Sequence, residues 1–247
     1  MKKKLVLLIT ILVVGLVTIR VLPSSAEKIV NQEFLQNNER EVVESAIKSG
    51  MIFINQEFLE NPDWNVSEEQ LPAIAGTPYK VYPIDPEKFK NMNADSCLRD
   101  FIKGSYEWEF PILTSEGEVI NVGSIAFLNG AWQFVGLGLT IPQSGVELSS
   151  KPDQIIELLE KEDLVVNFTD FKHIRWGLPP MDLLLVTANS QQYVVPIYYQ
   201  QKETHEDGRS FPVLDKIKPM QVYKANYFIN LIEAELSNAD PHMTIIK

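Results

Sequence analysis

The dipeptide Asn129-Gly130 constrains the fold of this 247-residue chain more than any other feature of its sequence. A two-residue type I′ turn needs a positive φ at both central positions, and Asn followed by Gly meets that need. Strand-like runs flank the pair, over residues 119–128 and 132–139. The pattern therefore predicts two antiparallel strands joined by a tight hairpin.

A third strand is expected just before this hairpin. Over residues 106–112, apolar and polar side chains alternate, which places aromatic and aliphatic residues on one face and Glu107 and Glu109 on the other. Residues 115–118 turn the chain back into the next strand. The three strands together predict an antiparallel β-meander whose acidic face is in contact with water.

The remaining periodic segments predict helices and a second hairpin. Three segments have the three- and four-residue apolar spacing of amphipathic helices, with Asn61-Pro62 ending the first. Because the strands occur in runs with helices outside them, we expect an α+β fold: an antiparallel β-meander and hairpins flanked by amphipathic helices. The helices are expected at 42–58, 150–159 and 220–236, a short strand at 79–84 and the second hairpin at 181–186 and 193–199.

The N-terminus has the three parts of a secretory signal, namely three lysines, the apolar run 5–19 and small residues ending at Ala26. The run is shorter than the roughly 20 residues that a membrane-spanning helix needs. This favours a signal peptide at 1–26 over an uncleaved anchor, which would contact the membrane only through residues 5–22. In either case the rest of the chain is expected to be extracytoplasmic.

Turn-rich stretches divide the rest of the chain into three parts. We expect an N-terminal helix at 27–60, an α+β unit with the meander at 61–148, and a helix-hairpin-helix unit at 149–247 packed with it as one compact body. Cys97 is the only cysteine, so no intramolecular disulfide can form and the fold depends on its hydrophobic core. We expect Cys97 to be a buried, non-catalytic residue.

The charge balance narrows the choice of partners. The net charge is −11, and it becomes −15 without residues 1–26, which carry four basic side chains and no acidic one. Such a charge argues against nucleic acid and against anionic lipid surfaces. A protein or a component of the cell envelope remains as the expected partner.

Few residues suggest chemistry, and none forms a known catalytic, phosphate-binding or dinucleotide-binding motif, so no cofactor is expected. Glu107 and Glu109 are the candidates for a carboxylate pair of the kind that glycosidases use. A loop at His205, Glu206 and Asp207 is the candidate metal site, although adjacent loop residues rarely converge on one ion. The candidate binding residues are the aromatics Tyr193, Tyr198 and Tyr199, because exposed tyrosines are favoured at binding surfaces.

These observations favour a non-catalytic binding or interaction module that acts outside the cytoplasm. An extracytoplasmic hydrolase with carboxylate chemistry and a membrane-tethered structural protein of the envelope are the alternatives. An enzyme should show a deep pocket with convergent polar groups and shifted pKa values, whereas a binding module should show a flat or grooved patch of exposed aromatic side chains.

Overall fold

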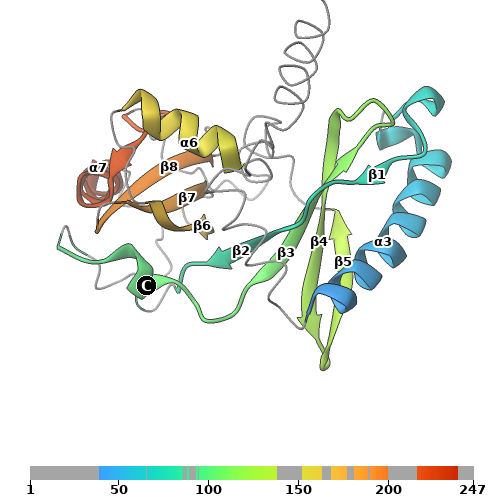
Figure 1. The fold of residues 1–247 in the computed structure, drawn as a ribbon, viewed down its shortest axis with the longest axis horizontal. Helices are drawn as coiled ribbons and strands as arrows, with labels where there is room; N and C mark the ends of the chain where they lie inside the picture. The colour runs from blue at the N-terminus through green and yellow to red at the C-terminus, as the bar shows by residue number, and fades with distance from the viewer. Residues whose placement is uncertain are drawn as a thin grey trace, which may run out of the picture.

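The fold is α+β, with one mixed sheet and helices on both of its faces (Figure 1). It is seen in a computed structural model that describes residues 39–64, 66–85, 88, 93, 95–137, 152–162, 168–176, 181–188, 190–199 and 216–238. The expected signal segment 1–26 and the loop containing His205, Glu206 and Asp207 lie outside these residues. Within the described ranges, no helix is both long and apolar enough to cross a membrane.

The described ranges contain the following helices and strands. The helices are α3 (Arg40–Glu60), α6 (Pro152–Lys161) and α7 (Ala225–Asn238), with short 3-10 turns at Pro62–Trp64, Glu68–Gln70 and Leu98–Phe101. The strands are β1 (Ile74–Ala75), β2 (Tyr79–Pro83), β3 (Glu107–Leu113), β4 (Val119–Leu128), β5 (Ala131–Leu137), β6 (Phe168–Trp176), β7 (Met181–Ala188), β8 (Gln191–Tyr199) and β9 (Tyr223–Lys224).

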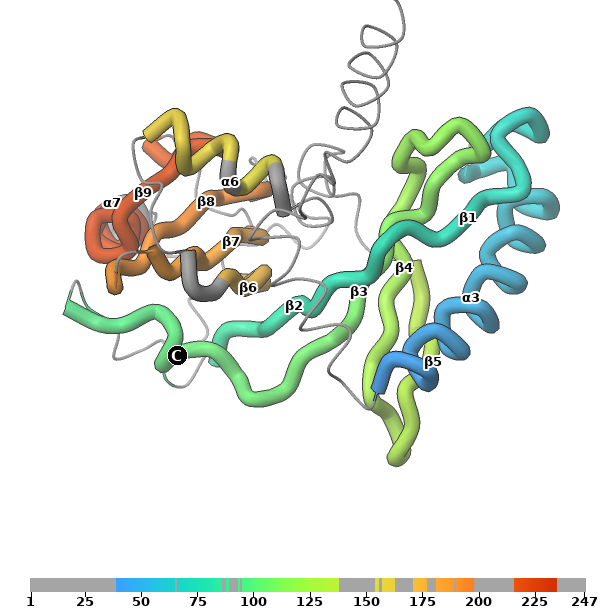
Figure 2. The backbone as a smooth tube through the Cα atoms, in the orientation of Figure 1, coloured from blue at the N-terminus to red at the C-terminus, as the bar shows by residue number. Residues whose placement is uncertain are grey.

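In the described part of the chain, the sheet has nine strands in the order β5-β4-β3-β2-β6-β7-β8-β9, and β1 also pairs with β3. Every neighbouring pair is antiparallel except β2 and β6, which run parallel and join the two halves of the chain. Figure 2 shows α3, β1, β4 and β5 of the first half on one side of this junction and α6 and α7 of the second half on the other. The parallel ladder is short and aligns Val81 with His173.

The strand registers show which helix covers which face of the sheet. Trp108, Phe110 and Ile112 of β3 form one apolar cluster with α3. Glu109 faces the opposite way, and on that face Leu184 of β7 packs with α6. The neighbouring residues of β7 face α7 in a third cluster, so α7 shares the face of α3.

The two halves have related topologies. In each, a helix precedes strands that follow one another outward from the junction, β2 to β5 in the first half and β6 to β9 in the second. The central strands are parallel, and α3 and α6 cover opposite faces. This is the arrangement that a two-fold axis along the strands, between β2 and β6, would produce.

The predicted turn at Asn129-Gly130 is confirmed, because φ is 53° at Asn129 and 83° at Gly130. The expected start of the last helix at residue 220 is wrong. Met220 has a φ of 60°, and Tyr223 and Lys224 pair with β8, so α7 begins only at Ala225. Cys97, expected to be buried, is an exposed free thiol.

Gly50 allows α3 to approach the sheet closely, and we expect Gly50→Ala to lower the melting temperature. A Cβ atom at this position would lie 2.6 Å from Cδ2 of Phe134. The helix preference for alanine is worth about 1 kcal/mol, whereas overpacking of this kind typically costs about 1–3 kcal/mol. Thermal unfolding should show a lower melting temperature for Gly50→Ala. It should show no decrease for Ser45→Ala, on the exposed side of α3. If Gly50→Ala and Ser45→Ala both melted at or above the melting temperature of the wild type, the Phe134 ring would have to move aside at no cost.

Candidate functional site

The two predicted acids of β3 have different environments. Glu107 is exposed, whereas Glu109 is only 1% exposed. The expectation that both contact water is therefore wrong for Glu109, because β6 and β7 bring charged side chains to the same face of the sheet. The structure consequently places Glu109 in a buried polar cluster and leaves Glu107 outside it.

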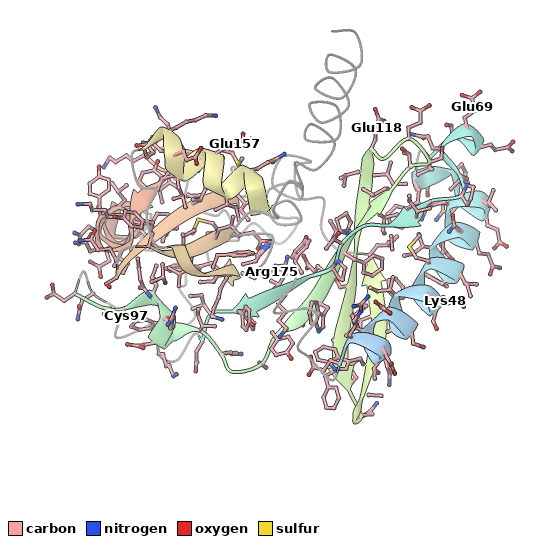
Figure 3. All side chains as sticks on the ribbon, in the orientation of Figure 1. Lys48, Glu69, Cys97, Glu118, Glu157 and Arg175 are labelled. Carbon is pink, nitrogen blue, oxygen red and sulfur yellow. The ribbon has the colours of Figure 1, made fainter. Side chains whose placement is uncertain are left out.

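The buried polar cluster consists of Tyr79, Glu109, His173, Arg175 and Asp182, contributed by β2, β3, β6 and β7, and of these the Arg175 side chain is 32% exposed while the others are buried. Arg175 donates from Nη1 to Glu109 Oε1 at 2.6 Å and from Nε and Nη2 to Asp182 at 3.0 and 2.8 Å. His173 Nε2 lies 3.1 Å from Asp182 Oδ2, and the Tyr79 hydroxyl donates to Glu109 Oε2 at 3.3 Å. Figure 3 shows Arg175 between the two halves of the molecule.

The electrostatics of the cluster favour its ionised form. Burial alone would raise the pKa of Asp182, but the bonds from His173 and Arg175 outweigh it and hold this pKa well below its usual range. Burial, together with the nearby Glu109 carboxylate, raises the pKa of the Tyr79 phenol. The paired carboxylates likewise outweigh desolvation of the guanidinium and raise the pKa of Arg175.

The cluster is better suited to holding the sheet together than to chemistry. All four carboxylate oxygens of Glu109 and Asp182 already accept hydrogen bonds from protein groups. The ring of Tyr79 is stacked on His173, with centroids 5.2 Å apart. Among the described residues, no group of three or more acids, histidines or cysteines is arranged to hold a metal ion. Arg175 instead connects Glu109 in the first half to Asp182 in the second.

An open apolar groove lies between α3 and the segment that contains β1, which run close together in Figure 1. Its volume is about 750 Å³. The two largest exposed aliphatic side chains on its sides are Ile52 of α3, 69% exposed, and Ile74 of β1, 49% exposed. Met51 and Ala73 line it more deeply, so the groove presents apolar surface that the fold itself leaves uncovered.

The backbone of β1 is held differently on its two sides. Gly76 N–H donates to the Pro111 carbonyl of the β3 strand at 2.7 Å. On the side facing α3, the Asn55 side chain donates to the Ala73 carbonyl at 3.1 Å and accepts from the Ala73 N–H at 2.8 Å. Because backbone groups alternate in direction along a strand, those of Ala75 point toward the groove.

No family model matches the chain. Searches of curated proteins and of solved structures likewise found no significant match.

Of the three tyrosines predicted to bind a partner, only Tyr193 has a described side chain. Tyr193 is 4% exposed and belongs to the core cluster beneath α6, with its hydroxyl bonded to Gln191 at 3.0 Å. It is therefore a core residue and not a surface residue. Tyr198 and Tyr199 belong to β8, where they pair with Asp182 and Met181, but their side chains lie outside the described part of the structure.

The groove was missed from the sequence, although a signal for it was present. The apolar face predicted for the first helix accounts for Met51, Ile54 and Phe58 but not for Ile52, which lines the groove and which the structure shows 69% exposed. Large apolar residues beyond the width of a buried helix face indicate a surface that meets something else.

Proposed function

We propose that this chain is a non-catalytic binding module acting outside the cytoplasm, and that it holds an extended peptide segment of a partner protein in the groove between α3 and β1. The single observation that carries the proposal is the combination of exposed apolar side chains with outward-pointing backbone groups in one groove. The export signal expected at residues 1–26 supports the location. The proposed framework is an antiparallel meander and hairpin flanked by amphipathic helices.

The backbone of β1 favours an extended peptide over other ligands. Asn55 already occupies the outward groups of Ala73, in the way that a neighbouring strand would. The next outward groups along the strand are those of Ala75, which can accept and donate one hydrogen bond each to an added strand. Asn55 thus closes one end of the strand edge and defines where an added peptide would begin to pair.

The dimensions of the groove fit a short peptide. Its α3 side extends from Glu44 to Asn55, a rise of roughly 16 Å at about 1.5 Å per residue. An extended strand covers that distance in about five residues at roughly 3.3 Å each. Alternate side chains of such a peptide would point toward Ile52 and Met51, so we expect the partner segment to carry apolar residues two positions apart.

The polar cluster supports a binding role over the hydrolase alternative. A catalytic acid or base must reach a substrate proton, but the carboxylates of Glu109 and Asp182 are buried and bonded to Arg175, His173 and Tyr79. The exposed groove and not the buried cluster therefore offers a surface for a ligand.

Selection of peptides on the exported, folded protein tests the proposal. Displayed heptapeptides selected on the wild type should bind Ile52→Asp at least tenfold more weakly, measured by fluorescence polarisation, because a charge replaces a central apolar contact worth about 1.4 kcal/mol or more. Leu59→Asp is the matched control, since Leu59 is on the same helix and is 65% exposed but does not line the groove.

The control should bind within twofold of the wild type. N-methylation of the peptide at one central backbone nitrogen should abolish binding if strand addition occurs. Peptides that bind Ile52→Asp as tightly as the wild type would exclude the groove as the binding site. Insensitivity to N-methylation at every position would exclude strand addition.

A further inference from the structure

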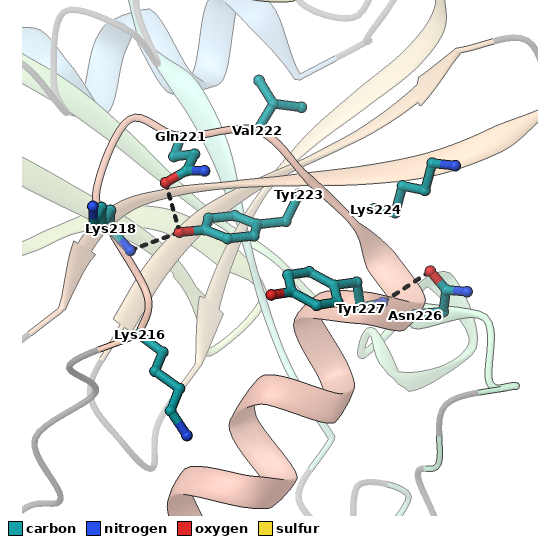
Figure 4. A pocket seen from close by; sticks show the side chains of 8 residues that line it. All are labelled: Lys216, Lys218, Gln221, Val222, Tyr223, Lys224, Asn226 and Tyr227. Atoms are coloured by element: carbon teal, nitrogen blue, oxygen red, sulfur yellow. Dashed lines mark hydrogen bonds between the residues drawn. The ribbon is translucent and has the colours of Figure 1, made fainter. Parts of the chain in front are cut away.

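A second surface, in the other half of the molecule, has a different chemistry. A pocket of about 600 Å³ lies where the chain enters α7 (Figure 4). Three of the described residues that line it are Lys216, Lys218 and Lys224, and none of the described lining residues is acidic. This positive pocket occurs in a chain whose net charge is −11. Such a local excess of positive charge attracts anions against the overall field of the protein.

Two tyrosines form the floor and one side of this pocket. Tyr223 is 6% exposed and Tyr227 is 56% exposed, and their rings stack with centroids 6.3 Å apart and an angle of 18° between planes. In Figure 4, the side chains of Lys216 and Lys224 extend on either side of the ring pair. The outer ring therefore offers a flat apolar surface beside positive charges.

Hydrogen bonds fix the inner part of the pocket. The Tyr223 hydroxyl accepts from the backbone N–H of Lys218 at 2.8 Å and donates to Gln221 Oε1 at 3.1 Å. These bonds use the Gln221 oxygen and leave its amide nitrogen able to donate. The backbone of Lys218 and the amide of Gln221 are thus held in place before any ligand binds.

Two of the charged groups on the rim, those of Lys218 and Lys224, are available to a ligand. In the described part of the chain, neither the ammonium group of Lys218 nor that of Lys224 has a hydrogen-bond or ion-pair partner, and the Tyr227 hydroxyl has none. Lysine is a flexible point charge that suits one anionic group without demanding the bidentate geometry of arginine. Phenol and amide groups in the same pocket suit the hydroxyls of a sugar or polyol.

We propose that this pocket binds a phosphorylated sugar or polyol, with Lys218 and Lys224 contacting the phosphate and the Tyr227 ring covering the carbon skeleton. Each observation accounts for one part of this ligand. The lysines suit its charged phosphate, the exposed ring suits the apolar face of its carbon skeleton, and the amide of Gln221 suits its hydroxyl groups. The same chemistry occurs in a free sugar phosphate and in a polymer of phosphate-linked polyols. The site is separate from the α3–β1 groove and does not depend on it.

Calorimetric titration of the exported protein at low salt tests this site with four probes: glucose 6-phosphate, poly(glycerol phosphate), inorganic phosphate and glucose. We expect one or both organophosphates to bind at least tenfold more tightly than inorganic phosphate or glucose. Tighter binding of the polymer would identify the polymeric source, and tighter binding of glucose 6-phosphate the free one. Equal affinity for inorganic phosphate, or no binding of either organophosphate, would overturn the proposal.

Two sets of variants locate the binding. The double variant Lys218→Gln, Lys224→Gln should weaken organophosphate binding at least tenfold, whereas the control Lys103→Gln, Lys161→Gln, two exposed lysines outside the pocket, should stay within twofold. Tyr227→Leu should reduce the preference of the pocket for organophosphates over inorganic phosphate, while leaving the melting temperature nearly unchanged. An equal loss in both double variants, or binding only to anionic lipid vesicles, would contradict the proposed site.

Discussion

Replacing Arg175 by Met should lower the free energy of unfolding by about 3–5 kcal/mol, because it leaves buried carboxylates without their cation. Glu109 and Asp182 are 1% and 4% exposed, and both accept hydrogen bonds from this guanidinium. For a chain of this size the loss corresponds to a fall of roughly 6–20 °C in melting temperature. Chemical denaturation and thermal unfolding would both measure it.

The exposed ion pair of α3 provides the control for this prediction. Arg40 donates to Glu44 at 2.8 Å on the surface, so Arg40→Met should change stability by no more than about 0.5 kcal/mol. Adding Glu109→Gln to Arg175→Met should cost much less than Glu109→Gln does alone, because the partner is already lost. Additive losses would show that Arg175 and Glu109 act independently and would contradict the cluster as a unit.

Acid should destabilise the protein through Asp182. Its pKa is held well below the ordinary value, so as the pH falls the unfolded chain binds the proton first, near pH 4. The stabilisation from this carboxylate is therefore complete above about pH 5 and is lost as the pH falls toward the folded-state pKa. One such proton contributes a slope of about 1.4 kcal/mol per pH unit.

Urea unfolding between pH 3 and 7 would measure this slope. Asp182→Asn should be less stable than the wild type at pH 7. Its unfolding free energy should also fall less steeply in acid, with a slope smaller by up to the contribution of one proton. Asp95→Asn, at an exposed position, should reproduce the slope of the wild type. Identical slopes in wild type and Asp182→Asn would mean that Asp182 carries no linked proton.

The raised pKa of Tyr79 affects stability at alkaline pH. Because the unfolded chain loses this proton first, the protein should lose stability as the pH rises above about 10.

The local elements were predictable because their signals are local. The period of two over 106–112, the Asn129-Gly130 turn and the apolar spacing of the first helix correspond to β3, the β4–β5 hairpin and α3. These patterns depend only on residues close together in the chain. The start of α7 was misplaced because the pairing of Tyr223 with Val194 of β8 interrupts an apolar spacing that reads as helix.

The buried polar cluster could not be derived from such patterns. Glu109 and Arg175 are 66 positions apart, and the parallel pairing that brings their strands together has no turn signal of its own. Alternating acids on a strand are normally found on a solvated face, which is why Glu109 was misassigned. A weaker signal was present in β7, where Asp182 stands next to an apolar run, because a charge in a buried strand requires a partner.

The parallel pairing of β2 with β6 also determines how the chain can be divided. Cutting between β5 and α6 would separate two lengths of chain that each carry a helix and their own strands. In each fragment, however, the central strand would become an outer one with a row of unpaired backbone groups, and such edges recruit strands from other molecules. Each half protects the other from self-association, so the two fragments should aggregate when made separately and should reassemble when they are made together.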